Sequence, residues 1–303
     1  MNIQRSVLFG GPVFPLATLA PLRRGRGDPC FQIAADGAIW RTSLMPSGAV
    51  TARITTPAPG VVDCEAWGDG ASEFSDALPA LLGADDDAEG FAPEEPTIAA
   101  ALRRAPHFRL GRTGRVLEAL IPAVLEQRVS GAESFRSWRV LVTKFGAPAP
   151  GPAPQRMRVP PSVDVWRRIP SWEFQRANVD PGRARTIVGC AQRASSLERL
   201  TQRAPESART ALTSLPGIGV WTAAEIAQRA WGDADALSVG DYHLAKVVGW
   251  TLLGYPIDDD EMVRLLAPLS PHRHRAVRLL EVSGLARNPR FGARQAVRNI
   301  AAL

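Results

Sequence analysis

The sequence feature that most constrains the fold is the stretch 215–219, Leu-Pro-Gly-Ile-Gly. It cannot lie inside a helix, because Pro216 has no backbone N–H and glycines adopt backbone angles that other residues avoid. The stretches on either side, 207–215 and 221–232, are compatible with helices. The pattern therefore predicts a helix, a tight hairpin and a second helix. The start of the second helix leaves N–H groups unpaired, and together with the helix dipole these favour an anion such as a backbone phosphate.

A carboxylate follows the hairpin at the distance of one helix. Asp241 comes directly after the apolar run 237–240 and precedes the segment 242–250, which is predicted to restart as a helix. Asp241 would then lie near a helix N-terminus. An ionised carboxylate in that place can stabilise a positive charge that develops during a reaction.

Taken together, these residues resemble the signature of the helix-hairpin-helix DNA glycosylases. The resemblance rests on 215–219, Thr222-Ala223, Val239-Gly240-Asp241 and Lys246. Within that superfamily the sequence is most similar to the bacterial alkylation-repair branch, DNA-3-methyladenine glycosylase II. A second stretch, 120–146, resembles the first long helix pair of the family, with Gln127 at the helix junction. The resemblance covers roughly residues 105–290 well and the N-terminal third only loosely.

The resemblance implies a monofunctional DNA glycosylase that flips alkylated purines such as 3-methyladenine out of duplex DNA and hydrolyses their N-glycosidic bond in base excision repair. Breaking that bond gives the sugar oxocarbenium character, which the carboxylate of Asp241 would stabilise. An alkylated purine is already cationic, so one carboxylate without a paired acid is sufficient. Bifunctional members of the superfamily carry a nucleophilic lysine where this chain has Trp221. We therefore expect water as the nucleophile and no lyase activity.

Further candidates surround this centre. Trp221 is either a wall of the substrate pocket or a buried core tryptophan. Tyr242 and His243 each either line the cleft or are structural. His272 stands where the family usually has an aromatic residue, which changes the expected clamp on the flipped base. The candidate DNA-binding residues are Gly217, Ile218, Gly219, Thr222, Gln127, Lys246 and Arg273. For Gln127 and Lys246 capping is the alternative role, and for Arg273 it is a solvated helix face.

Catalysis by such an enzyme needs no cofactor. The family resemblance implies a structural monovalent cation, held by the backbone carbonyls of Gly217 and Gly219. The three cysteines, Cys30, Cys64 and Cys190, lie far apart without C-x-x-C spacing. This spacing excludes the four-cysteine iron–sulfur cluster of one branch of the superfamily and gives no zinc site. The cysteines are expected to be reduced thiols of a cytosolic protein.

The expected fold is mainly α-helical, with a small N-terminal α+β domain at 1–95 and a helical glycosylase domain at 96–303. Strands are predicted at 30–33, 38–44 and 50–54, a helix at 65–82 and an acidic loop at 84–95. The helical domain is expected to form two lobes, with an exposed proline-rich connection at 147–161. The stretch 180–181, Asp-Pro, predicts a helix start.

Charge is segregated between the two parts. Residues 1–95 contain six arginines and thirteen acidic residues, whereas residues 96–303 contain 30 basic and 17 acidic residues. A basic module beside an acidic one is typical of nucleic-acid binders, so damaged double-stranded DNA is the expected partner. No apolar run is long enough for a membrane span, and glycines and prolines interrupt the apolar stretch 7–22. We expect a monomeric, cytoplasmic protein associated with the nucleoid.

Two other functions fit parts of the pattern. A non-catalytic helix-hairpin-helix protein would bind DNA through the same turn, but an anion at Asp241 would only weaken its affinity for the backbone. A glycosylase for oxidised or mismatched bases is the second alternative. The missing lysine and the missing cysteine cluster argue against it.

Overall fold

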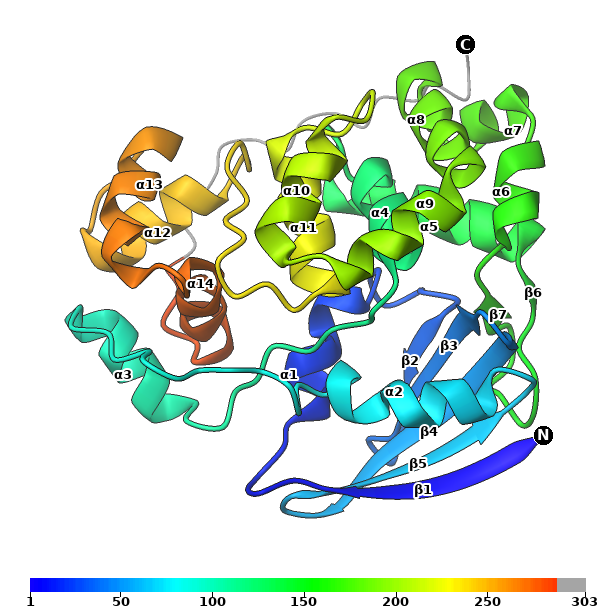
Figure 1. Ribbon diagram of the computed structural model, residues 1–303, viewed down its shortest axis with the longest axis horizontal. Helices are drawn as coiled ribbons and strands as arrows, with labels where there is room; N and C mark the ends of the chain where they lie inside the picture. Colours follow the sequence, from blue (N-terminus) through cyan, green and yellow to red (C-terminus); the bar gives the residue numbers. More distant parts are fainter. Residues whose placement is uncertain (288–303) are drawn as a thin grey trace.

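The computed structural model describes residues 1–287, and its N-terminal part is built on an antiparallel sheet (Figure 1). The five strands lie in the order β1-β5-β4-β3-β2. Their bounds are β1 Asn2–Leu8, β2 Phe31–Ile33, β3 Ile39–Met45, β4 Gly48–Ala58 and β5 Val61–Trp67. Helix α2 (Ala71–Leu81) lies across one face of the sheet and buries Phe74 and Leu78 against strand residues such as Val50 and Ile54. The remaining short helix here is α1 (Pro15–Leu19).

The sequence prediction for this sheet is correct in part. Strands β2, β3 and β4 coincide with the three predicted runs, but β1 and β5 were not predicted. The helix predicted from residue 65 is wrong at its start, because residues 65–67 belong to β5 and the helix begins at Ala71. Strand β5 lies between β1 and β4, and β1 pairs with it across more than fifty residues of sequence. The pairing of β1 is non-local and leaves no signal in a short window. Strand β5 also forms a hairpin with β4 through Pro59-Gly60, a local signal that the prediction did not use.

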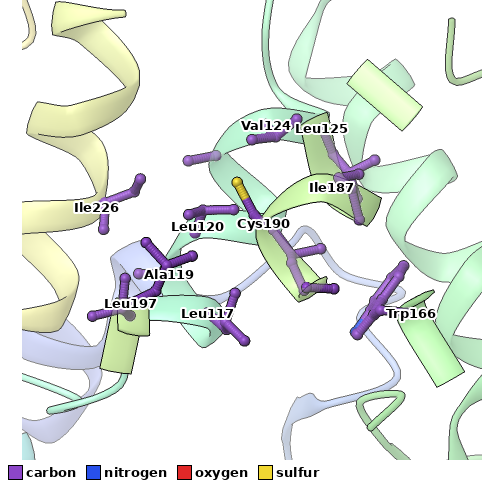
Figure 2. Packing of buried hydrophobic residues seen from close by; sticks show 14 of the residues in the cluster. Leu117, Ala119, Leu120, Val124, Leu125, Trp166, Ile187, Cys190, Leu197 and Ile226 are labelled. Atoms are coloured by element: carbon purple, nitrogen blue, oxygen red, sulfur yellow. The ribbon is translucent and has the colours of Figure 1, made fainter. Parts of the chain in front are cut away.

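The helical part surrounds one strongly apolar helix, α4 (Val116–Leu125), in which every residue except Glu118 is buried. Figure 2 shows Leu120 and Val124 of this helix beside Ile187 and Cys190 of α8, with Ile226 of α11 on the other side. A helix that is apolar on nearly all sides needs such cover from several partners. The surrounding helices are α5 Gly131–Phe145, α6 Val163–Arg168, α7 Ser171–Arg176, α8 Pro181–Gln192, α9 Ala194–Glu198, α10 Pro205–Thr213 and α11 Val220–Ala230.

A second group of helices has its own cluster of buried side chains. It contains α12 (Leu244–Leu252), α13 (Asp259–Leu266) and α14 (Arg273–Val282), which bury Val248, Met262 and Leu266 among themselves. Helix α3 (Pro96–Arg104) packs on α14 through Ile98 and Leu280. Figure 1 shows these four helices at the side of the molecule away from α6–α8. None of the helices within residues 1–287 is long and apolar enough to cross a bilayer.

The proline-rich connection is more ordered than the sequence predicts. Its ends form a two-stranded ribbon of β6 (Ala147–Pro148) and β7 (Arg158–Val159). The carbonyl of Arg158 accepts a hydrogen bond from the Thr42 hydroxyl at 2.5 Å, and the Arg158 N–H donates to the Pro29 carbonyl at 2.8 Å. Val159 is fully buried. The prediction of an exposed connection is therefore wrong at its C-terminal end, where Arg158 binds β3 through its carbonyl and the segment before β2 through its N–H.

Candidate functional site

The hairpin between α10 and α11 has the predicted form, and its two glycines play different roles. Gly217 has φ +83°, and a Cβ at this position would lie 2.1 Å from Thr186 Oγ1. Gly219 has φ −90°, and a Cβ there would meet nothing within 4 Å. Only Gly217 is thus required by the backbone, which corrects the expectation that both glycines are. Ile218 between them is buried in the main core and anchors the turn.

The apex of the hairpin is an exposed helix start. Gly219 is the N-cap residue of α11 and has no side chain to cap the first N–H groups. Both glycines and Val220 are exposed, Val220 by 63%. Free donors at an exposed helix N-terminus suit an anion, so the geometry is compatible with the predicted phosphate contact, which stays a prediction.

Gln127 and Thr222 brace the hairpin from inside. The Gln127 amide donates to the Gly217 carbonyl and to Thr222 Oγ1, each at 2.9 Å. Thr222 is buried, so its side chain supports the turn instead of facing DNA as expected. The Gly217 carbonyl uses one lone pair for the Gln127 amide and keeps a second, so the monovalent cation expected from the family resemblance stays a prediction. No step of the chemistry is therefore assigned to that cation.

Asp241 is held by donors from two helices. Its Oδ1 accepts from the backbone N–H groups of His243 and Leu244, at 2.8 and 2.9 Å, where α12 begins. Its Oδ2 accepts from the indole N–H of Trp221, in the first turn of α11, at 3.2 Å. All three donors are neutral, so the negative charge is fixed in place without being cancelled by a cation.

Asp241 lines a cavity of about 670 Å³. The wall includes residues of α11, of the loop before Asp241, of α12 and α14, and of the N-terminal segment around Pro21. Phe108 contributes an aromatic ring. The volume is in the range of small-molecule sites and is sufficient for one nucleotide. The fixed anion of Asp241 and the exposed helix start of α11 thus lie beside one open cavity.

Comparison with known proteins identifies this architecture. Among solved structures, the fold is similar to that of a 3-methyladenine DNA-glycosylase from Archaeoglobus fulgidus, with a TM-score of 0.74 and 18% sequence identity. The match covers 92% of this chain and 98% of that one. It is also similar to the 8-oxoguanine glycosylase/lyase of Clostridium acetobutylicum bound to double-stranded DNA (TM-score 0.70, 13% identity, 94% and 98%). The chain has the helix-hairpin-helix DNA glycosylase fold. The mainly helical fold with a small N-terminal sheet, predicted from the sequence, is thereby confirmed.

The sequence comparison agrees with this fold. A protein of Mycobacterium tuberculosis strain H37Rv, named "Probable bifunctional transcriptional activator/DNA repair enzyme AlkA", is 31% identical over 235 residues. The match covers 71% of this chain and 45% of the relative, and it is the same for the protein of strain CDC 1551. The chain thus spans less than half the length of the curated relatives it matches. No family model matches the sequence. The predicted resemblance to the alkylation-repair branch is confirmed at the level of sequence similarity.

Within this glycosylase fold, the predicted pocket residues lie around the cavity and not in it. Trp221 contacts Asp241 but does not line the cavity among the described residues. Tyr242 is 66% exposed, with the Lys246 ammonium 4.4 Å from its ring centroid. His272 is buried, edge-to-face against Phe91, with a ring nitrogen 3.2 Å from the Glu89 carbonyl. The expected place of His272 at the flipped base is therefore not its place in the fold.

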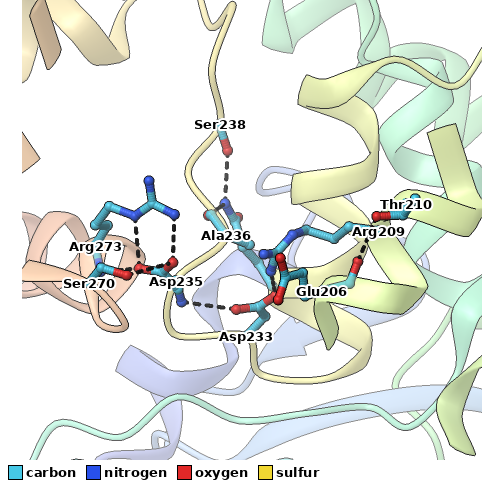
Figure 3. A network of polar contacts seen from close by, with 10 residues as sticks. Glu206, Arg209, Thr210, Asp233, Asp235, Ala236, Ser238, Ser270 and Arg273 are labelled. Carbon is cyan, nitrogen blue, oxygen red and sulfur yellow. Dashed lines mark hydrogen bonds and ion pairs between the residues drawn. The ribbon is translucent and has the colours of Figure 1, made fainter. Parts of the chain in front are cut away.

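Arg273 is also engaged elsewhere than predicted. Its guanidinium binds Asp235 with both Nε and Nη2, at 2.8 and 2.5 Å (Figure 3). On the other side of the same loop, Arg209 forms an ion pair with Asp233. These two pairs fix the loop 231–240, which is directly followed by Asp241. Because Asp235 already neutralises the charge of Arg273, we assign Arg273 to holding the loop before Asp241 in place and not to binding DNA.

Sequence analysis missed several residues that line the cavity, among them Glu225 and Gln228 of α11 and His274. His243, which the sequence offered beside Tyr242 as a residue of the cleft, does line it. Burial and the nearby cation of Arg278 hold the pKa of His274 well below its ordinary value, so this ring is neutral at neutral pH. The expectation of a single carboxylate is wrong, since Glu225 and Glu281 share the cavity with Asp241. Both pair with arginines, which distinguishes them from Asp241. The four-residue spacing of Trp221 and Glu225, which places both on one face of a helix, is the sequence signal that could have identified Glu225.

Proposed function

We propose that this protein is a monofunctional DNA glycosylase that removes alkylated purines from damaged duplex DNA, acting as a monomer in base excision repair. The observation that carries the proposal is the setting of Asp241, fixed by three neutral donors inside a nucleotide-sized cavity. A protein that only binds DNA has no use for such a charge, because it repels the phosphate backbone.

The proposed reaction begins with the hairpin. The free N–H groups at the start of α11 hold a backbone phosphate, and the damaged nucleotide rotates into the cavity. As the C1′–N bond breaks, positive charge develops on the sugar, and the fixed carboxylate of Asp241 stabilises it. Its three hydrogen bonds keep it in place, so little reorganisation is needed at that moment. Water then attacks the sugar.

Two features support water as the nucleophile and a cationic base as the leaving group. Trp221 occupies the place of the nucleophilic lysine, and an indole nitrogen cannot form a Schiff base. A purine alkylated on a ring nitrogen leaves as a neutral base, so it requires no proton. The carboxylates of Glu225 and Glu281 are bound to Arg229 and Arg278 and are not placed as free acids.

The test is the substitution Asp241→Asn, which keeps the shape and removes the charge. Base release is measured in single turnovers on duplexes with one 3-methyladenine, 7-methylguanine or 8-oxoguanine. We expect Asp241→Asn to slow release of the methylated purines by about a hundredfold or more. Asp260→Asn, the same change on the exposed surface of α13, serves as the control.

Gel analysis of each reaction before and after alkali treatment separates base release from strand cleavage. Wild-type protein is expected to leave intact abasic strands until alkali is added. A wild-type rate for Asp241→Asn refutes the catalytic assignment. Faster release of 8-oxoguanine than of the methylated purines refutes the substrate class, and cleavage without alkali refutes the monofunctional mechanism.

A further inference from the structure

One wall of the cavity is made of polar side chains that the reaction described above does not use. Glu225 and Gln228 of α11 and Ser238 of the following loop all line it. Glu225 and Ser238 are nearly inaccessible, with 9% and 5% of their surface exposed. Polar groups buried at that level are normally bonded to one another, so their remaining hydrogen-bonding capacity determines what the wall offers a ligand.

The hydrogens of these three side chains are already used inside the protein. The Gln228 amide donates to the Ala236 carbonyl at 2.7 Å and to Ser238 Oγ at 2.8 Å. The Ser238 hydroxyl donates to Glu225 Oε1 at 2.5 Å. A Gln amide has two N–H donors and a Ser hydroxyl has one. What remains toward the cavity is therefore oxygen lone pairs, on Glu225 and on the amide oxygen of Gln228.

The two arginines of the same wall are turned to protein acceptors. The Arg229 guanidinium donates to the Pro21 carbonyl at 3.1 Å and pairs with Glu225 Oε2 at 2.7 Å. The Arg278 guanidinium pairs with Glu281 and donates to the Ala17 carbonyl. A carboxylate oxygen accepts more than one hydrogen bond, so Glu225 keeps acceptor capacity after binding Ser238 and Arg229.

Glu225 also lies on the helix face that carries the catalytic contact. It follows Trp221 by four residues, which places both on one side of α11. Trp221 holds Asp241, the proposed contact of the sugar, and Glu225 lies one turn further along in the wall of the same cavity. A base attached to that sugar would meet the acceptor wall.

We propose that Glu225 is a specificity-determining residue, whose carboxylate accepts a hydrogen bond from the exocyclic amino group of the extruded purine. The amide oxygen of Gln228 is the second acceptor of this site. The inference rests on the proposed function and adds to it how the base is recognised. An N–H donor on a cationic ring bound to a carboxylate forms a charge-assisted hydrogen bond, the stronger kind. Purines with an amino group are thus preferred over purines of equal charge that lack one.

The test compares two lesions that differ only in the amino group. One duplex carries 7-methylguanine and the other carries 7-methylhypoxanthine, both cationic. We expect wild-type protein to release 7-methylguanine about tenfold faster or more in single turnovers, the size of one hydrogen bond to a charged group. In Glu225→Gln the ratio of the two rates falls severalfold, because the charge-assisted bond is lost and Arg229 draws the single remaining oxygen of the side chain, while the Gln228 amide oxygen still accepts.

Ser238→Ala is the matched control. It removes the hydroxyl that links Glu225 to the loop of Asp241 but leaves the carboxylate, so it slows both substrates alike and keeps their ratio. A wild-type ratio near one overturns the proposal without any variant, and so does an unchanged ratio in folded Glu225→Gln. If wild-type protein releases neither purine faster than Asp241→Asn does, the proposed function fails and this inference fails with it.

Discussion

At the scale of single residues, Trp221 and Asp241 form one hydrogen-bonded pair. The sequence identifies both and assigns them separate roles, one as a pocket wall and one as the catalytic anion. The structure joins them through the indole N–H. Two backbone donors fix Oδ1 at the start of α12, and the indole fixes Oδ2 from α11. Without the indole the carboxylate keeps its place on α12 but loses the donor that orients its plane toward α11.

We therefore expect Trp221→Phe to slow base release while the protein stays folded. Loss of one hydrogen bond to a charged group predicts a decrease of about tenfold in the single-turnover rate. Trp172→Phe is the control, because Trp172 is a 58% exposed tryptophan of α7. An undiminished rate in Trp221→Phe would mean that the two backbone donors orient Asp241 without help.

At the scale of helices and strands, the sequence predicts what local chemistry determines. The start of α8 at Pro181 is confirmed, with Asp180 accepting from the N–H groups of Gly182 and Arg183. The hairpin and the helix after Asp241 are also where the sequence places them. Strand β1 was missed because its partner β5 lies far away in the chain. Strand β5 was missed although it pairs with β4 through the short turn at 59–60.

Side-chain directions at the site were less predictable than the elements. His272 and Arg273 were assigned to substrate and DNA, and both face protein partners in the fold. The partner of Arg273, Asp235, lies 38 residues away. The spacing within α11 places Glu225 beside Trp221, but only the packing of the loop shows that this face borders a cavity. The spacing of residues in the sequence thus indicates which side chains share a helix face, but it does not indicate what that face contacts.

Substitutions at the two hairpin glycines distinguish the folding of the hairpin from its proposed contact with DNA. Gly219→Asp supplies a good N-cap residue, since Gly219 already has extended backbone angles. Its carboxylate would take up the free N–H groups and repel phosphate. We expect affinity for damaged and undamaged duplexes to fall together by about tenfold or more at low salt, with stability unchanged or raised. Titration of both duplexes and urea unfolding measure the two effects.

The comparison variant is Gly217→Ala. It forces a side chain into left-handed backbone and against Thr186, so we expect it to lower the free energy of unfolding by about 1–3 kcal/mol. A folded Gly219→Asp protein that keeps wild-type affinity for both duplexes would place the DNA anchor outside the hairpin.

At the scale of the whole molecule, the segregated charges of the sequence meet inside the fold. Asp86, from the acidic loop before α3, binds Arg275 of α14 through two hydrogen bonds at 2.8 and 2.5 Å. Arg275 also donates to the Asp87 carbonyl. The two paired side chains are 2% and 5% exposed. Part of the basic excess of the helical region is thus matched by the acidic loop and is not available to DNA.

This buried pair leads to a prediction about stability. In Asp86→Asn the guanidinium of Arg275 stays buried without its counter-charge, so we expect the free energy of unfolding to fall by about 3–5 kcal/mol. Asp85→Asn is the matched control, because its partner Arg112 and Asp85 itself are each about half exposed. For such a surface pair the expected loss is below about 1 kcal/mol. Urea unfolding of both variants measures the two losses of unfolding free energy. Equal losses would show that the buried pair does not hold the acidic loop on α14.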